Sequence, residues 1–333
     1  MESPSTGRTA PPYREPPALL PQKRPDFTVR IPVLRPTWDG LVPWYVRTYS
    51  GGVNPELVLT LSCPDRRGIV HAVTGALAAA GGNITESRQY GDPDNGRFLM
   101  RVQAAEVADE AGLREALGAL AQEFGMEWNL DQVGRPMRTL ILASKEAHCL
   151  SDLLFRTRDG RLPLDVVGVV ANHDVLRPLA EFYGTHFHHI PVTRETKPAA
   201  EAELLRLVEE LDVELVVLAR YMQVLSDDVC RVLAGRAINI HHSFLPSFKG
   251  ARPYAQAHAR GVKLIGATAH YVTADLDEGP IIEQDVARAG HEDSVAELQA
   301  RGQDVERQVL ARAVRWHAEH RVLLDGSKTV VFA

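Results

Sequence analysis

Apolar residues follow two different rhythms along this chain, and the change between them falls near residue 135. Before that point, short segments such as residues 56–62 alternate apolar and polar positions, as half-buried strands do. A stretch with helical spacing at 69–80 stops at Gly81-Gly82-Asn83, because glycine adopts positive φ without penalty. Further strands are expected at 84–90, 98–102 and 128–133, and a helix at 109–124. This order predicts a βαββαβ unit of ferredoxin-like topology.

Beyond residue 135 the strand candidates become continuous apolar runs, at 139–143, 166–170, 215–219 and 237–240. Amphipathic segments at 149–157, 175–183 and 199–211 separate them. Buried strands that alternate with helices predict an α/β domain with a doubly wound, mostly parallel, Rossmann-like sheet. Two more strands at 267–273 and 280–287, a helix at 294–317 and a hairpin at 321–332 are expected to complete it.

The first residues of the chain differ in composition from the rest. Ten of the 21 prolines lie in residues 1–43 among polar side chains, which bury too little apolar surface to offset the entropy of ordering the chain. We therefore expect a largely disordered tail at 1–54, a first domain at 55–134 and a second domain at 135–333.

Composition and charge exclude several classes of protein. Residues 1–54 carry a net charge of +3, which leaves about −9 for the remainder of a chain whose total is −6. That is a poor match to a nucleic acid. Cys63, Cys149 and Cys230 form no CxxC pair, which fits a reducing compartment and argues against a thiolate zinc site. Without a long apolar run or a signal-peptide pattern, we expect a cytoplasmic protein that does not enter the membrane.

Candidate chemistry lies at the ends of two late strands. Asn239 and His241 flank Ile240 at a strand end, so alternation points both side chains to one side of the sheet. In open α/β sheets, sites form at such carboxyl ends. Asp277 lies in a second loop that Gly279-Pro280 bends sharply, and His270 lies on the strand before it. An amide, an imidazole and a carboxylate could orient a carbonyl, hold an oxyanion and move protons.

The first domain carries a recognisable motif. The stretch Cys63-Pro64-Asp65-Arg66-Arg67-Gly68-Ile69-Val70, followed by Gly81-Gly82-Asn83-Ile84, resembles an ACT domain, a small regulatory fold. The resemblance implies ligand sensing or subunit pairing, with Asp65, Arg66, Gly68 and Asn83 at the regulatory site. The plainer alternative is that Asp65 and Gly68 only cap and start a helix.

The second domain resembles the formyltetrahydrofolate formyltransferase superfamily over residues 138–290. The shared pattern is Asn-x-His, then Ser-x-Leu-Pro, then Leu-Asp-x-Gly-Pro. The resemblance implies that Asn239 and His241 hold the formyl oxygen and that Asp277 handles the nucleophile's proton, with His270 as its supporting partner. It also implies a pterin pocket lined by Arg220, Tyr221, Met222, Gln223, Val224 and Leu225.

Within that superfamily, the chain is most similar to the hydrolytic deformylases that carry an ACT domain. The turn at 144–149 lacks the glycines that cradle a substrate phosphate in glycinamide-ribonucleotide transformylases. His241-His242 replaces the His-Pro usual in transferases. The resemblance implies that water attacks 10-formyltetrahydrofolate, with Asp277 as the base and its pKa raised by partial burial. Formate for purine synthesis and tetrahydrofolate would be the products, and His242 would support the site.

The same resemblance implies no cofactor beyond the folate substrate, methionine or glycine as effectors, and a homo-oligomer. Two alternatives stay open: a formyltransferase acting on a small amine, and a non-catalytic folate sensor. The histidines of His186-x-His188-His189 are not expected to bind a metal ion. Metal sites need convergent ligands, and no carboxylate or cysteine lies beside these histidines at the spacing of metal ligands. We expect no metal site.

Overall fold

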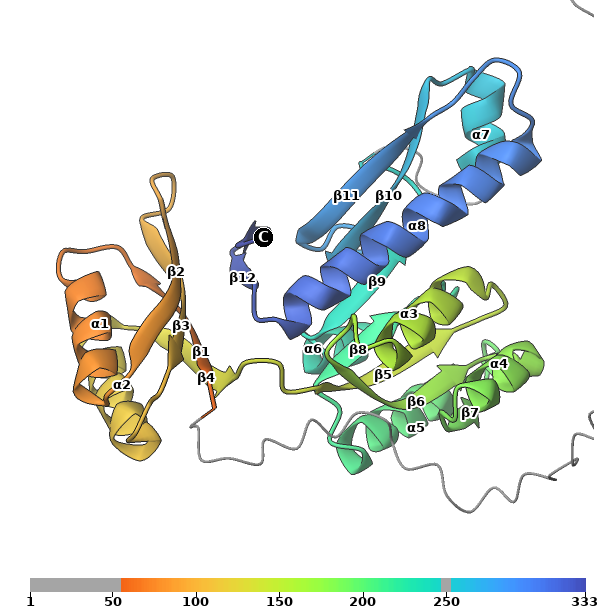
Figure 1. Cartoon of the computed structure of the whole chain (residues 1–333). Coiled ribbons are helices and arrows are strands. Elements are labelled where there is room, and N and C mark those ends of the chain that lie inside the picture. Colours follow the sequence, from red (N-terminus) through yellow and green to blue (C-terminus); the bar gives the residue numbers. More distant parts are fainter. Residues whose placement is uncertain (1–54, 247–252) are drawn as a thin grey trace, which may run out of the picture. The chain divides into compact units, whose positions relative to one another are not determined.

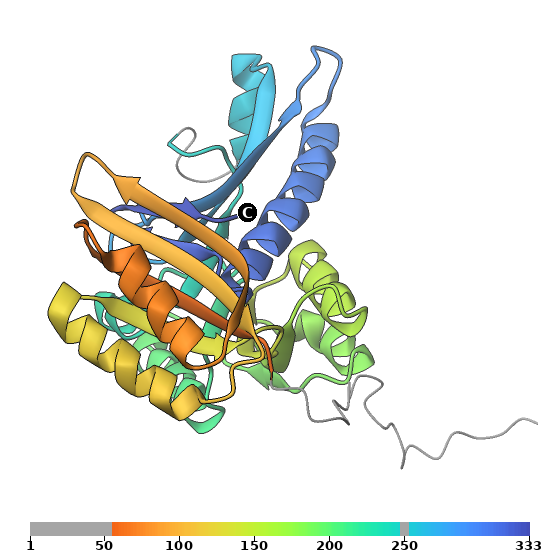
Figure 2. The same cartoon turned by 60° about the vertical axis from the view of Figure 1, so that its left-hand side comes forward.

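The computed structural model describes residues 55–246 and 253–333. Its first part is a four-stranded antiparallel sheet in the order β2-β3-β1-β4. The elements are β1 (Leu57–Pro64), α1 (Ile69–Ala79), β2 (Asn83–Asp92), β3 (Arg97–Ala105), α2 (Glu110–Phe124) and β4 (Glu127–Gln132). Helices α1 and α2 cover one face of this sheet (Figures 1 and 2). The predicted βαββαβ order is confirmed.

Alternation in β1 explains how this sheet meets its helices. Leu57, Leu59 and Leu61 are all at most 2% exposed and belong to one core cluster with Val73 of α1 and Leu117 of α2. Burying each such side chain contributes about 2 kcal/mol. Helix α2 ends at Gly125, whose φ of 64° lets the chain reverse into β4.

The second part is a seven-stranded sheet in the order β11-β10-β9-β8-β5-β6-β7. Its strands are β5 (Met137–Ala143), β6 (Leu164–Ala171), β7 (Phe187–His189), β8 (Leu215–Leu218), β9 (Ala237–His241), β10 (Leu264–Tyr271) and β11 (Ile281–Arg288). The strands from β9 through β7 run parallel, whereas β10 and β11 join antiparallel. The predicted mostly parallel sheet is confirmed.

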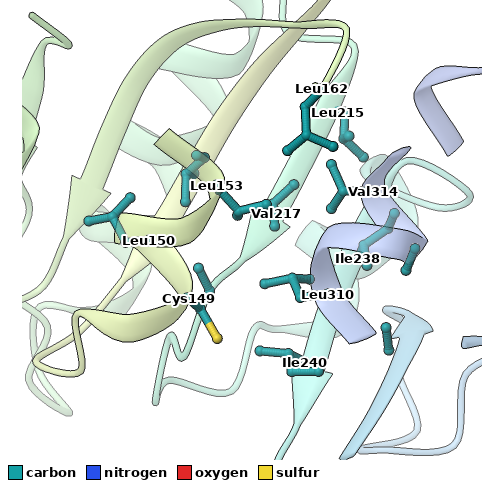
Figure 3. Packing of buried hydrophobic residues seen from close by; sticks show 14 of the residues in the cluster. Cys149, Leu150, Leu153, Leu162, Leu215, Val217, Ile238, Ile240, Leu310 and Val314 are labelled. Carbon is teal, nitrogen blue, oxygen red and sulfur yellow. The ribbon is translucent and has the colours of Figure 1, made fainter. Parts of the chain in front are cut away.

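Helices cover both faces of this sheet. They are α3 (His148–Arg158), α4 (Arg177–Phe182), preceded by a 3-10 turn at Asp174–Leu176, α5 (Lys197–Glu210), α6 (Asp227–Val232), α7 (Pro253–Arg260) and α8 (Val295–Ala318). Strand β5 shows why its run is continuously apolar: Ile141 packs with α3 and α8, whereas its neighbour Leu142 packs with α5 and α6. Figure 3 shows Leu310 and Val314 of α8 facing Ile238 of β9 and Val217 of β8.

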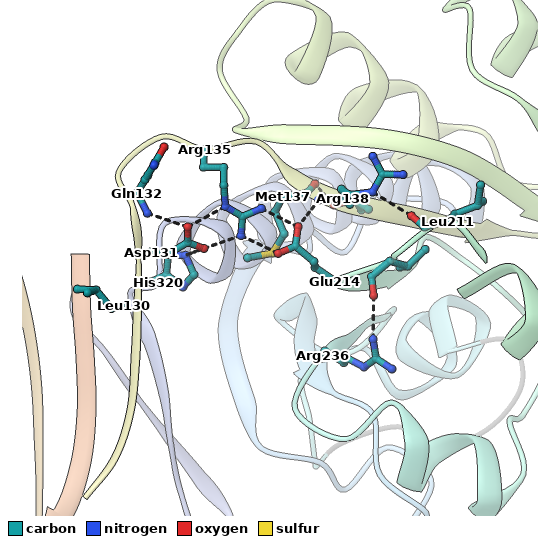
Figure 4. A network of polar contacts seen from close by, with 12 residues as sticks. Leu130, Asp131, Gln132, Arg135, Met137, Arg138, Leu211, Glu214, Arg236 and His320 are labelled. Atoms are coloured by element: carbon teal, nitrogen blue, oxygen red, sulfur yellow. Dashed lines mark hydrogen bonds and ion pairs between the residues drawn. The ribbon is translucent and has the colours of Figure 1, made fainter. Parts of the chain in front are cut away.

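The chain ends in a small hairpin of β12 (Val322–Asp325) and β13 (Lys328–Val331), as expected. In the segment that connects the two sheets, Arg135 lies between two carboxylates, those of Asp131 in β4 and Glu214 just before β8, at 2.5 and 2.6 Å (Figure 4). These two ion pairs thus fix the segment that connects β4 to β5.

Some helices and strands differ from those expected from the sequence. Helices α6 and α7 were not predicted, because six and eight residues carry too little periodicity to be distinguished from loops. The strand expected at 267–273 covers Leu264–Tyr271. The expected tail at 1–54 lies outside the described residues. Among the helices that the structure describes, none is long and apolar enough to cross a membrane.

Candidate active site

The register between β9 and β10 brings the side chains of Asn239 and His270 together. Strands β9 and β10 pair antiparallel, so that His270 lies opposite Asn239 and Thr268 lies opposite His241. The Asn239 Nδ2 atom is 3.2 Å from His270 Nε2. The two side chains therefore form a hydrogen-bonded pair at the carboxyl end of β9.

The other nitrogen of His270 fixes the direction of that hydrogen bond. Its Nδ1 is 2.9 Å from the Tyr271 carbonyl oxygen, which can only accept. Nδ1 therefore carries the proton, and Nε2 accepts from the Asn239 amide. Burial lowers the pKa of His270, in keeping with a neutral ring. The second amide hydrogen of Asn239 is left for another acceptor.

Asp277 reaches the same place from the loop between β10 and β11. It has a φ of 58°, and a Cβ on the following Gly279 would lie 1.8 Å from the Tyr271 carbonyl oxygen, so only glycine fits there. Asp277 Oδ2 is 3.2 Å from His241 Nδ1, and its Oδ1 is 3.8 Å from His270 Nε2. His270 thus lies beside Asp277, as expected, but its hydrogen bond is to Asn239.

The expected pKa shift of Asp277 is wrong in sign. The hydrogen bond from His241 lowers the pKa of Asp277, and His270 and His242 add to this. Burial acts in the opposite direction but is the smaller effect. Partial burial alone predicted a raised value because the partner on Oδ2 could not be foreseen. Asp277 is a carboxylate at neutral pH.

His241 also presents a second, unused nitrogen. Its side chain is 7% exposed, and its Nε2 is buried without a hydrogen-bond partner among the described residues. His242 stacks on it, with ring centroids 5.2 Å apart. Burial, and then the charge of Arg220, lower the pKa of His242 to about 4, so this ring is neutral at pH 7.

A pocket opens over these residues. It is lined by Asn239, His241, His242, His270, Leu276 and Asp277, and by the whole predicted segment Arg220, Tyr221, Met222, Gln223, Val224 and Leu225. Met222 donates its backbone N–H to Ser144 Oγ at 2.9 Å, which ties this segment to the end of β5. Met222 and Val224 are more than half exposed and form an apolar rim.

The candidate regulatory residues do not form one cluster. Gly68 stands at the start of α1 with φ 98°, and no side chain caps that helix, so Asp65 is not its cap. Arg66 lies over the Phe124 ring at 4.2 Å and donates to the Glu123 carbonyl oxygen. Asn83 begins β2. The structure thus engages Arg66 with the end of α2.

Sequence reasoning missed a buried group at the other side of the pocket. His148, Cys149 and Glu306 are, within the described residues, the one set of such side chains close enough to share a metal ion. Glu306 comes from α8, far along the chain, so no local motif could indicate it. Two features disfavour a metal there: Arg220 lies 3.4 Å from Glu306, and burial, then Glu306, raise the pKa of the Cys149 thiol. The expectation of no metal site stays a prediction.

Comparison with known proteins assigns both parts of the chain. Residues 137–314 match the formyl transferase family model and residues 57–125 match the ACT domain model. The formyltetrahydrofolate deformylase of Corynebacterium sp. strain P-1 is 53% identical over 277 residues, which are 82% of this chain and 97% of the relative. The Bacillus subtilis deformylase is 46% identical, with 85% and 96% covered.

Solved structures agree with this assignment. A Pseudomonas syringae formyltetrahydrofolate deformylase is similar with a TM-score of 0.82 and 47% identity, covering 86% of this chain and 96% of the other. A glycinamide ribonucleotide transformylase from Symbiobacterium toebii reaches 0.57 and 31%, covering 62% and 98%. With an ACT domain before a formyl transferase domain, and with relatives of this identity over most of its length, the chain belongs to the formyltetrahydrofolate deformylase family.

Proposed function

We propose that this protein is a hydrolase that converts 10-formyltetrahydrofolate to formate and tetrahydrofolate. The observation that supports it best is the convergence of Asn239, His241 and Asp277 in one pocket with the 220–225 segment. The folate ring would lie against that segment, whose backbone groups suit the flat polar edge of a pterin and whose apolar side chains suit its faces. The formyl group would then lie over Asn239 and His241.

In the proposed mechanism, Asn239 and His241 hold the formyl oxygen. His270 accepts one amide hydrogen of Asn239 and leaves the other for the substrate. Asp277 binds Nδ1 of His241, which stabilises a protonated imidazole that donates from the unused Nε2. Both donors strengthen as the carbonyl becomes an oxyanion, and one such donor contributes about 2.7–4 kcal/mol to the barrier.

Asp277 moves the protons. Water attacks the formyl carbon and gives a proton to Oδ1, the oxygen that is not bound to His241. As the carbon–nitrogen bond breaks, the leaving nitrogen takes that proton, so that tetrahydrofolate and formate result. Because the pKa of Asp277 is lowered, it is a modest base but a ready acid toward the leaving nitrogen.

Transfer to a small amine is the weaker alternative. The curated relatives at 38–53% identity carry the deformylase name, whereas the similar transformylase structures are 25–31% identical. The turn at 144–149 also has no glycine to bring backbone N–H groups close to a phosphate, and its His148 ring is bound to Glu306 at 2.8 Å.

Several finer assignments belong to the same proposal. We propose domain limits of 55–134 and 135–333, a cytoplasmic location and no cofactor beyond the substrate. We further propose that methionine or glycine acts through the ACT domain, where it would contact Asp65, Arg66 and Gly68 or, at the other end of the sheet, Asn83, and that the chain forms homo-oligomers. Formate released here would feed purine synthesis and balance one-carbon pools.

The deciding experiment is a spectroscopic assay of 10-formyltetrahydrofolate without any acceptor. We expect formate and tetrahydrofolate in equal amounts, and a rate that responds to added methionine or glycine. No formate from the full-length protein would contradict the proposed hydrolysis. An unchanged rate with both amino acids would contradict the proposed effectors only.

A further inference from the structure

Behind His242 lies a buried polar cluster centred on Glu306, which is 1% exposed on α8. Its Oε1 accepts from the Tyr254 hydroxyl at 2.5 Å, and its Oε2 lies 2.8 Å from His148 Nε2 and 3.4 Å from Arg220 Nε. The four residues come from α8, α7, α3 and the end of β8. We call them the Glu306 cluster.

This cluster is closely packed. Gly302 stands one turn before Glu306 on α8, and a Cβ there would lie 2.1 Å from the Tyr254 hydroxyl and 2.3 Å from its ring. The bare backbone of α8 thus makes room for the phenol to reach Glu306.

The cluster is also a charge pair. Burial alone would raise the pKa of Glu306, but His148, Arg220 and Tyr254 together hold it below its ordinary value. Glu306 is therefore a buried carboxylate, and the Arg220 guanidinium pairs with it by charge at 3.4 Å, since Nε and Nη1 of Arg220 form no hydrogen bond within the described residues. Removing one partner of such a buried pair leaves the other uncompensated.

Arg220 is the member of the Glu306 cluster that also lines the pocket. Arg220 lines the pocket beside His242, whereas His148, Tyr254 and Glu306 do not. Its side chain is 13% exposed, and its φ of 63° turns the chain at the start of the pocket segment. Arg220 therefore stands between the pocket and the carboxylate behind it.

We propose that Arg220, held by Glu306, closes this side of the pocket and makes the enzyme specific for water by excluding amine nucleophiles. An amine brings substituents into the pocket that water lacks, and a guanidinium in the pocket lining would restrict the room for them and repel any positive charge on them. Water needs neither space nor a binding site there. This inference rests on the proposed hydrolysis.

The test measures which nucleophile, water or an added amine, receives the formyl group. With 10-formyltetrahydrofolate and glycinamide, the carbon–nitrogen bond to the folate breaks in every case, and the new bond is to water oxygen or to the amine nitrogen. The leaving nitrogen takes the proton from the nucleophile. Mass spectrometry of formate and N-formylglycinamide gives the ratio of the two products.

Arg220→Gly is the informative variant, because glycine adopts a φ of 63° freely and opens a path to the Glu306 carboxylate. We expect formate alone from the wild type, and at least a tenfold rise in the formylglycinamide fraction from the variant. Arg220→Met keeps most of the bulk and loses the charge, so it should form less N-formylglycinamide than Arg220→Gly does. Asp212→Gly, at an exposed residue with φ 47°, controls for the added glycine.

A wild-type product ratio in Arg220→Gly at saturating glycinamide would overturn the proposal. So would loss of all formyl turnover in a folded Arg220→Gly protein, because Arg220 would then serve the reaction itself. If that variant does not fold, Glu306→Gln replaces it: it deprives Arg220 of its anion and should also give formylglycinamide, and its absence would overturn the proposal. Failure of the wild type to form formate would instead contradict the proposed hydrolysis.

Discussion

At the scale of single residues, the proposed chemistry depends on one hydrogen bond between two side chains that are 36 positions apart. The pair of His241 Nδ1 and Asp277 Oδ2, 3.2 Å apart, lowers the pKa of the carboxyl and leaves Nε2 of the ring without a hydrogen-bond partner within the described residues. Asn239 and His270 form a second pair beside it. Each of these side chains is therefore oriented by a partner from another part of the chain.

We expect Asp277→Asn and His241→Ala each to lower kcat by about 10²–10³. That is the effect of losing one hydrogen-bond donor to a developing oxyanion, and we expect the loss of the proton carrier Asp277 to have a similar effect. Folate binding should persist, because the 220–225 segment is untouched. Steady-state kinetics and calorimetric titration with tetrahydrofolate measure the two effects. Asp275→Asn, exposed in the same loop, is the matched control. Full turnover in either of the first two variants would rule out its assigned role.

The lowered pKa of Asp277 yields a separate prediction. In His241→Ala the hydrogen bond that lowers this pKa is gone and the burial that raises it stays, so the pKa should rise. A group with a depressed pKa stabilises the folded state above its unfolded pKa and loses that contribution as pH falls through the folded value. NMR titration of ¹³C-labelled aspartate carboxyls, from pH 2 to 7, measures the shift. An equal pKa in both proteins would contradict this account.

At the scale of elements, α8 connects the hydrophobic core to the Glu306 cluster. One face packs Val309 and Val314 into the hydrophobic core, while Gly302 and Glu306 meet Tyr254 and His148. Its start is defined by a capping box of Ser294 and Glu297. Periodicity predicts this helix well but not what its one buried carboxylate contacts.

Two glycine-to-alanine substitutions in helices should differ in sign. Gly302→Ala drives a methyl group into the Tyr254 ring and should destabilise the protein by about 1–3 kcal/mol. Gly118→Ala in α2 meets nothing within 4 Å and should stabilise it by up to about 1 kcal/mol, through helix propensity. Urea unfolding of both variants measures the difference, and equal effects would show that the Tyr254 contact is not tight.

At the scale of the whole molecule, a buried arginine in the first sheet binds residues that follow α8, near the C-terminal end of the chain. Arg101 of β3, 1% exposed, donates to the carbonyl oxygens of Glu319 and His320 just after α8, at 3.0 and 3.1 Å, and pairs with Glu86. Leu99 of β3 also packs with Leu323 and Phe332 of the C-terminal segment. The two parts should therefore unfold together.

Arg101→Met removes a buried donor from two part-buried carbonyl oxygens and should cost about 3 kcal/mol. We expect the single calorimetric unfolding transition of the wild type to separate into two. Arg88→Met, half-exposed and paired with the same Glu86, should cost less than about 1 kcal/mol. A single transition in Arg101→Met would mean that the apolar contacts alone couple the two parts.

Local pattern was sufficient for much of this protein. Alternation in β1, the apolar runs of β5 and β8, and the shared side of Asn239 and His241 all follow from a period of two residues. The motifs around Asn239 and Asp277 pointed to one family and one pocket. These features depend on neighbours in the chain, which the sequence displays directly.

Only the tertiary structure decided the rest. The lowered pKa of Asp277, the Asn239–His270 hydrogen bond and the Glu306 cluster depend on atoms that meet across 31 to 158 residues of chain. Electrostatic energies change steeply over a few ångströms, and no periodicity records such distances. The amino-acid sequence by itself determined which chemical groups are present and on which elements, whereas folding decided which of them touch and therefore which carry charge.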